Sequence, residues 1–295
     1  DLYNFSVKTF IENSRPAISL RTDYLDADLR GYYDFSSLRT QVREILSGLM
    51  PSRFLKPDGK NELLENNFTF SVSFKNTDRL NNFFKTGFLI SEKSYLSGAV
   101  FNDSIMWVKG EAKSLSFRNN TLTNLVLDGK TSSTELAIKL KSSSLRILGQ
   151  SELKGFFVDL DTKPDTFLLD LGWDNNEKVL SSGRFIASGR FRRKENGNSL
   201  LDINIDPTDI FVRNNLWKIS SSSIALDSSS LKVNKLFISN NEHSYLVDGS
   251  VSEDPNDTLQ VEFNGIDISP LNYLAEKKEN TDRIPLGLKG DLNGD

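Results

Sequence analysis

The 295-residue sequence contains no cysteine and a single histidine, His243. Without cysteine the chain forms no disulfide, thiolate metal site or cysteine nucleophile; the absence fits an exported protein, although many cytosolic proteins share it. His243 follows an Asn-Asn-Glu turn signal. We interpret it as a solvated turn residue, because a metal site needs further ligands.

Catalytic motifs are also absent. The sequence has no G-x-S-x-G elbow, Walker loop, H-E-x-x-H zinc motif or dinucleotide fingerprint. The carboxylates at 159–162 and 253–257 lack the spacing of a calcium loop. The 40 acidic residues permit a carboxylate pair suited to glycoside hydrolysis, but so many chance pairs carry little information. We expect a protein that is not an enzyme and uses no cofactor or metal.

Long apolar runs and blocks of one charge are missing as well. No stretch approaches the roughly 18 apolar residues of a membrane span, and no signal-peptide pattern opens the chain. The 36 basic and 40 acidic residues are interspersed, so the sequence shows no charged surface suited to nucleic acid or to anionic lipid headgroups, and we expect no nucleic-acid partner. The most cationic segment, 190–194, precedes a turn signal. We interpret it as the charged end of a hairpin, with a phosphate or headgroup contact as the alternative.

The residues that are present favour a folded β-protein. Hydrophobic residues make up 37% of the chain and include 20 Phe, which excludes a disordered segment. We expect one continuous unit over 1–295, with a possible boundary near 87–94 where helix-containing sequence gives way to pure alternation. The start at Asp1 and the strand-like residues 286–295 predict an internal piece of a longer protein.

Two short helices are predicted in the N-terminal third. The first covers 38–49, with Ser36 or Ser37 as N-cap and Pro51 as the stop. We expect its apolar stripe to pack against a sheet; the stripe consists of Leu38, Val42, Ile45, Leu46 and Leu49. The second covers about 77–87, beginning at Thr77 or Asp78 and ending near Gly87. Its apolar residues are Leu80, Phe83 and Phe84.

The remainder alternates apolar and polar residues in the manner of β-strands. Turn signals at 128–130, 195–198, 248–250 and 253–257 separate the runs, which predicts an antiparallel meander with one apolar face. Such a face is covered by closure into a barrel, by a second sheet, or by curling into a trough for a ligand; alternation does not distinguish these. The clearest apolar rows are Phe167, Leu169, Leu171, Trp173; Leu201, Ile203, Ile205; and Leu259, Val261, Phe263.

The C-terminal part resembles a known family. Residues 231–278 are similar to the repeating unit of TamB-like (translocation and assembly module) proteins of the AsmA-like group. The resemblance is carried by Ser239–Asn240, by Asp248–Gly249, by the S-x-D-P-x-D-x-L-x-V-x-F pattern at 252–263 and by the closing stub at 268–272. Residues 284–295 look like the start of another unit, and 35–51, 66–84 and 214–233 also resemble this family.

This resemblance implies an elongated, mainly all-β antiparallel meander curled into a U-shaped groove with an apolar lining. It implies a periplasmic protein of Gram-negative bacteria, anchored in the inner membrane and reaching the outer membrane. Phospholipid transport is the implied function, and assembly of outer-membrane or secreted β-barrel proteins is the alternative. The three apolar rows above would then contact acyl chains, whereas without the resemblance they are interpreted as a protein core. An adhesin-like or glycan-binding β-sandwich is the remaining possibility.

Overall fold

The computed structural model describes residues 4–34, 38–55, 66–78, 81, 85–101, 105–148, 151–195, 197–267 and 291–294. They form one antiparallel sheet of 20 strands, with the helix α1 (Leu38–Leu49) beside it. The strands are β1 (Ser6–Glu12), β2 (Arg15–Arg21), β3 (Leu25–Tyr32), β4 (Asn67–Phe74), β5 (Phe88–Ile90), β6 (Tyr95–Phe101), β7 (Ile105–Phe117), β8 (Asn120–Thr131), β9 (Leu136–Ile147), β10 (Ser151–Lys163), β11 (Thr166–Asp174), β12 (Ser182–Arg193), β13 (Ser199–Ile205), β14 (Thr208–Val212), β15 (Asn215–Ile219), β16 (Ser222–Leu226), β17 (Leu231–Ser239), β18 (Ser244–Val251), β19 (Leu259–Asp267) and β20 (Asp291–Gly294).

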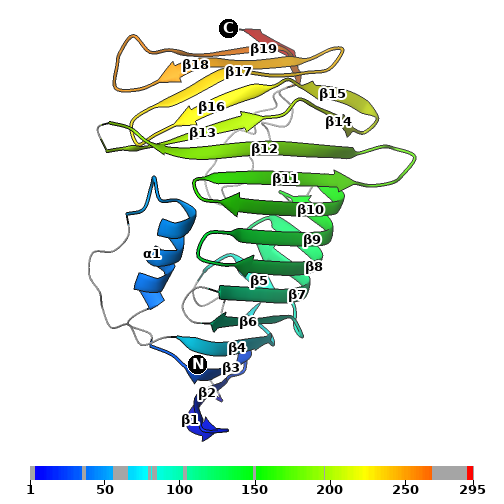
Figure 1. The fold of residues 1–295 in the computed structure, drawn as a ribbon. Coiled ribbons are helices and arrows are strands. Elements are labelled where there is room, and N and C mark those ends of the chain that lie inside the picture. The colour runs from blue at the N-terminus through cyan, green and yellow to red at the C-terminus, as the bar shows by residue number, and fades with distance from the viewer. Residues whose placement is uncertain are drawn as a thin grey trace, which may run out of the picture.

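The sheet is the long antiparallel meander that the alternation predicts. Most strands pair with both of their neighbours in the chain, so the chain climbs from β1 at the bottom of Figure 1 to β19 at the top. The exceptions are β5, which pairs with β7 while β4 pairs with β6, and the β14–β15 hairpin, beside which β13 pairs with β16. Among the described strands the first and last do not pair with each other, so the ladder runs from edge to edge without closing into a ring. The segment 87–94 contains β5 and the break before β6, and both strands belong to this same sheet.

Helix α1 confirms the first predicted helix, including the stop before Pro51. Its side chains pack less completely than predicted. Leu49 is buried and Ile45 and Leu46 are half-buried, but Val42 is 52% exposed. The proposed N-cap residues 36 and 37 lie outside the described residues, and so do 79–80 and 82–84 of the predicted second helix, which include its apolar residues Leu80, Phe83 and Phe84.

The C-terminal end of α1 is fastened to strand-connecting turns. The backbone N–H of Asp165, in the β10–β11 turn, donates to the carbonyl oxygen of Leu49 at 2.8 Å. The Asp165 carboxylate in turn accepts hydrogen bonds from the N–H and the hydroxyl of Ser52, at 2.9 and 2.8 Å. Figure 1 places α1 beside the left ends of the strands. The helix therefore packs its last turn, and not its whole stripe, against the sheet.

Two predicted turns are wrong, and two are confirmed. Residues 195–198 and 253–257 do lie between strands, whereas 128–130 lie inside β8 and 248–250 inside β18. Asp128 is tolerated in a strand because it lies between Lys109 and Lys139 on the neighbouring strands. Gly249 is extended but has a φ of 111°, a conformation that favours glycine.

A line of irregularities crosses the sheet. The β7–β8 ladder skips the pair of Lys113 and Asn124, and the β9–β10 ladder skips the pair of Ser143 and Gly155. The partner of a long strand also changes at this line. Strand β7 pairs with β6 on one side of it and with β5 on the other. In the same way, β12 pairs with β13 on one side and with β14 on the other. Lys235, inside the β17 register shift, has a φ of 49°.

Breaks of this kind favour a local bend in the strand that carries them. We call this feature, at 91–94, 113, 124, 143, 155, 206–207, 220–221 and 234–235, the bend line. In Figure 1 the β14–β15 hairpin, beyond the bend line, leaves the row of long strands at the right of the view.

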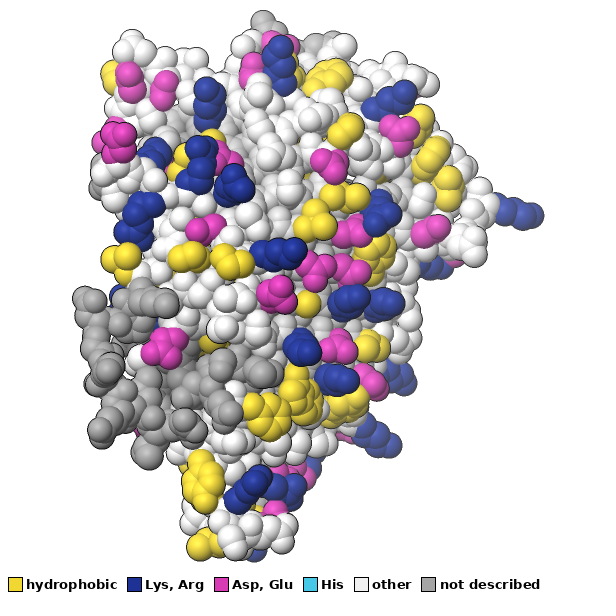
Figure 2. Space-filling view, in the orientation of Figure 1, with side chains coloured by type: hydrophobic (Ala, Val, Ile, Leu, Met, Phe, Trp, Pro, Cys, Tyr) yellow, Lys and Arg dark blue, Asp and Glu magenta, His cyan; other side chains and the backbone are white. Residues whose placement is uncertain are grey.

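One face of the sheet is polar and carries cross-strand ion pairs. Arg184 of β12 forks onto Asp170 of β11, with Nε–Oδ1 and Nη2–Oδ2 distances of 2.9 and 2.7 Å. This hydrogen bonding, together with the positive charge of Arg184, lowers the pKa of Asp170. Figure 2 shows charged side chains of both signs interspersed over the visible face. The mixture suits a solvated surface.

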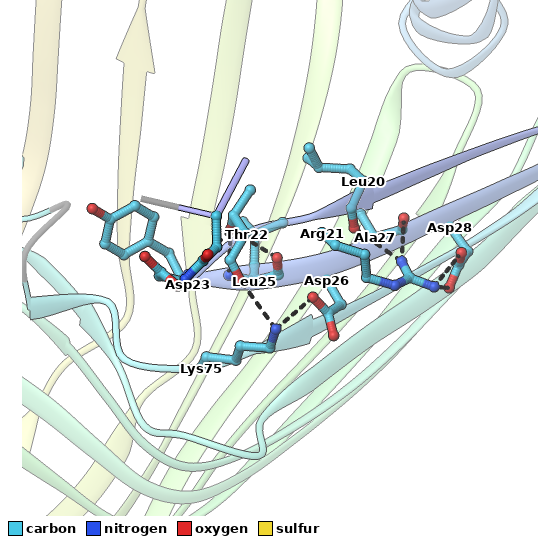
Figure 3. A network of polar contacts seen from close by, with 11 residues as sticks. Leu20, Arg21, Thr22, Asp23, Leu25, Asp26, Ala27, Asp28 and Lys75 are labelled. Carbon is cyan, nitrogen blue, oxygen red and sulfur yellow. Dashed lines mark hydrogen bonds and ion pairs between the residues drawn. The ribbon is translucent and has the colours of Figure 1, made fainter. Parts of the chain in front are cut away.

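The same arrangement recurs near the first strands (Figure 3). Arg21 Nη2 contacts both carboxylate oxygens of Asp28 at 2.8 and 3.0 Å, and Lys75 Nζ contacts Asp26 at 2.6 Å. Burial opposes ionisation of Asp28, but hydrogen bonds from Arg21 and Ser19 outweigh it and lower its pKa. These pairs are partly exposed to solvent, which screens them, so each contributes little stability alone.

The Asp170–Arg184 pair gives a pH-dependent prediction. A double-mutant cycle with Asp170→Asn and Arg184→Gln should show a small favourable coupling at pH 7. Because the folded-state pKa of Asp170 is lowered, this coupling is present above the ordinary Asp pKa and is lost as the pH falls through the folded value. Urea unfolding at several pH values measures it; a coupling that grows towards low pH would contradict the assignment.

The α1 attachment gives a second prediction. A Cβ on Gly48 would lie 1.9 Å from the carbonyl oxygen of Ser133 in the β8–β9 turn. Gly48→Ala should therefore destabilise the protein by about 1–3 kcal/mol and loosen α1, although alanine favours an isolated helix. Hydrogen exchange of the α1 amides measures this, with Arg43→Ala on the exposed helix face as the control. Unchanged protection in Gly48→Ala would show that α1 does not rest on this turn.

Candidate functional site

The candidate site is the apolar face of the sheet. Side chains alternate along a strand, and directly opposite residues of an antiparallel pair share a face. Gly189 of β12 lies opposite both Phe167 of β11 and Ile203 of β13. The predicted rows of β11 and β13 therefore lie on the same side of the sheet.

The third predicted row lies on this side too. From β13 the register runs through β16, β17 and β18 to β19, along Ile203, Ile224, Val233, Gly249 and Leu259. Leu259, Val261 and Phe263 thus share the face of Phe167 and Ile203, although three strands separate them from β13. The structure places all ten predicted residues on one face, in one group on β11 and β13 and a second group on β19.

The same face continues towards the N-terminus. Opposite Leu169, on the other side of β11, lies Leu160, and the row proceeds strand by strand to β2. Its members are Leu160, Ile138, Gly129, Val108, Gly98, Phe70, Leu29 and Ile18. We call the whole surface, from β2 to β19, the apolar face.

The apolar face is neither buried nor fully exposed. Of the ten predicted residues Ile205 is buried at 6% exposure and Val261 is 47% exposed, while the others are half-buried. A second sheet packed on this face would bury most of these side chains. The strands that the structure describes all belong to a single sheet, so none of them forms a separate second sheet on this face.

Aromatic rings lie flat on this face because glycines lie opposite them. A Cβ on Gly189 would be 2.1 Å from the Phe167 ring, and one on Gly183 would be 2.6 Å from the Trp173 ring. Phe70 covers Gly98 in the same way. The pairing shields the glycine backbone and keeps the face smooth. The alternation in the sequence predicted Phe167 and Trp173 but not these glycines. Their role is seen only from the cross-strand register, which places them opposite the rings.

Trp173 adds one polar group to the apolar face. Its indole Nε1 is inaccessible to solvent and has no hydrogen-bond partner within the described residues. A buried donor of this kind costs free energy until an acceptor reaches it. Both a water molecule and a ligand oxygen satisfy that need.

His243 differs from its prediction as a solvated turn residue. Its ring stacks on Trp217 at a centroid distance of 6.1 Å and an interplanar angle of 15°, and its side chain is 26% exposed. Tyr245 lies against the same indole at 5.9 Å. Packing of aromatic surface therefore fixes the imidazole. The described residues contain no cluster of three His, Cys, Asp or Glu suited to a metal ion.

No protein-family model matches the chain, and neither the curated proteins nor the solved structures contain a match. The described part of the chain also contains no helix with the length and apolar character needed to cross a bilayer. The candidate site is consequently defined by its own geometry.

Single cysteines test whether the apolar face is accessible, since the chain has none of its own. We expect Leu171→Cys, half-buried on this face, to react with bimane in the native state and to give blue-shifted emission, because its surroundings are open but apolar. Asn204→Cys on the polar face should react and emit as in water, and Ala187→Cys, at 3% exposure, should react only on unfolding. A Leu171→Cys variant as inert as Ala187→Cys would identify the face as closed core.

Proposed function

We propose that this chain is a non-catalytic, TamB-like segment of the cell envelope that carries phospholipid between the inner and outer membranes, with acyl chains lying along its apolar face. The observation that supports this most directly is the continuity of that face. Apolar residues and glycines follow one another in register from β2 to β19, without a charged residue in the row that links Ile18 to Leu169.

The physical chemistry of such a face suits a chain of methylenes. Each methylene removed from water contributes about 0.8 kcal/mol, and this contribution needs no directional hydrogen bond. Binding is then similar at every point along the face, which permits movement from one point to the next. A ligand recognised by fixed polar groups would instead stop at those groups.

The bend line supports the further proposal that the sheet is a trough. Breaks in register on successive strands fold the sheet along its length, and a polar face suited to solvent leaves the apolar face for the inside of the fold. The resemblance to TamB-like proteins supports the same shape, the periplasmic location and an inner-membrane anchor elsewhere in a longer chain. Half-buried side chains are what an open trough provides.

Mass spectrometry of the purified chain tests the proposal. We expect phospholipid to co-purify and to be reduced severalfold in Leu169→Asp and Val261→Asp, because a carboxylate on the apolar face repels acyl chains. Leu168→Asp is the matched control: the same substitution on the adjacent residue, which is 47% exposed on the opposite face. Circular dichroism checks that each variant folds.

The outcomes separate the two interpretations of the face. A lipid signal lost in folded Leu169→Asp and kept in Leu168→Asp supports transport. A parent protein without lipid, together with unfolding of Leu169→Asp, indicates a packed core and removes the proposal.

One observation favours a second candidate, assembly of outer-membrane or secreted β-barrel proteins. Among the described strands β1 pairs with β2 alone, so its other edge is open to an added strand. Its apolar residues are exposed: Val7 at 52%, Phe10 at 42% and Ile11 at 79%. Slower exchange of the β1 amides on adding an unfolded β-barrel protein would favour this candidate, and unchanged exchange would remove it.

A further inference from the structure

The left ends of β12 and β13 combine cations with the end of the apolar face. Arg192, Arg193, Lys194, Glu195 and Leu200 line a cavity of about 510 Å³ at this turn. In Figure 2 dark-blue Lys and Arg side chains gather at the upper left, the side on which Figure 1 places the β12–β13 turn. The sequence singled out this cationic segment without deciding what it contacts.

Two of the three cations already have partners. Arg192 Nε donates to Asp202 Oδ2 at 2.6 Å, and Lys194 forms an ion pair with Asp227 of the β16–β17 turn. Lys194 and the neighbouring serines lower the pKa of Asp227, so the carboxylate that Lys194 contacts is ionised at neutral pH. In both pairs the positive charge is balanced by a carboxylate, and the two contacts hold the β12–β13 turn in place.

Arg193 is the cation that remains. Within the described residues it has no ion pair or hydrogen bond to an acidic side chain, and it is exposed. Arg193 and Phe191 alternate on β12, so both lie on the side of the apolar face, and Phe191 is opposite Leu201. Phe191 also lies 6.4 Å from the Phe167 ring. A free guanidinium thus borders the apolar face at its rim.

We propose that Arg193 binds the phosphate of a phospholipid whose acyl chains lie on the adjacent apolar face, beside Phe191 and Leu201. The guanidinium matches two phosphate oxygens at once, and the apolar neighbours match the chains. Glu195 lines the same cavity, and its carboxylate repels any phosphate there, so binding also needs the contacts of the acyl chains. The proposal rests on the proposed function, since it places the headgroup of the same lipid.

Short-chain soluble lipids test it by calorimetry on the full 295-residue chain. Dihexanoyl phosphatidylglycerol should bind about tenfold more tightly than dihexanoylglycerol, which lacks the phosphate. Arg193→Gln should abolish that difference and leave dihexanoylglycerol binding unchanged. Arg190→Gln is the matched control, because Arg190 is an exposed arginine on the same strand that faces the polar side. Added salt should reduce the tenfold preference.

Each contrary outcome has its own meaning. Equal binding of the two lipids, or an equal loss in Arg190→Gln, would overturn the phosphate site and leave lipid carriage intact. Binding of glycerol phosphate as tight as that of the lipid would also overturn it, by showing a site for free phosphate. Binding of neither lipid would remove the proposed function together with this inference.

Discussion

The whole structure depends on cross-strand register. Because side chains alternate with a period of two, a slip of one residue between any two neighbours would send every later apolar side chain to the solvent side. The register keeps Phe70, Leu160, Leu169 and Ile203 on one face across strands that lie far apart in the sheet. Charge pairs on the opposite face, such as Asp170 with Arg184, lie in the same register and would be broken by the same slip.

Alternation in the sequence was sufficient for the antiparallel meander and for the division into an apolar and a polar face, and helical spacing before Pro51 was sufficient for the first helix. It was not sufficient for the turns at 128–130 and 248–250, because Asp-Gly is also compatible with a strand when neighbouring strands supply lysines or when an extended glycine has a positive φ. The bend line was missed for a related reason. It is built from Lys113, Asn124, Ser143 and other residues that carry no common sequence signal and that meet only through pairing.

The candidate site, too, has features that the sequence predicted and features that depend on strand pairing. The ten predicted residues could be found from single strands, but the smoothness of the face depends on Gly98, Gly183 and Gly189, whose importance arises from the rings opposite them. His243 was misjudged because its stacking partner, Trp217, lies on another strand. Local sequence predicts which residues share the apolar face, whereas distant pairing decides what they contact.

The simple order of the strands has a consequence for the evolution of length. Most strands pair with both of their neighbours in the chain, and the exceptions lie around β5 and the β14–β15 hairpin. In the regular stretches one added hairpin therefore inserts two strands without changing the side on which any other residue lies. Neighbouring strands are about 4.8 Å apart, so each hairpin extends the sheet by roughly 10 Å. The length of such a sheet can therefore increase in equal steps of one hairpin. Duplication of hairpins alone would fit a sheet of this design to the distance between two surfaces.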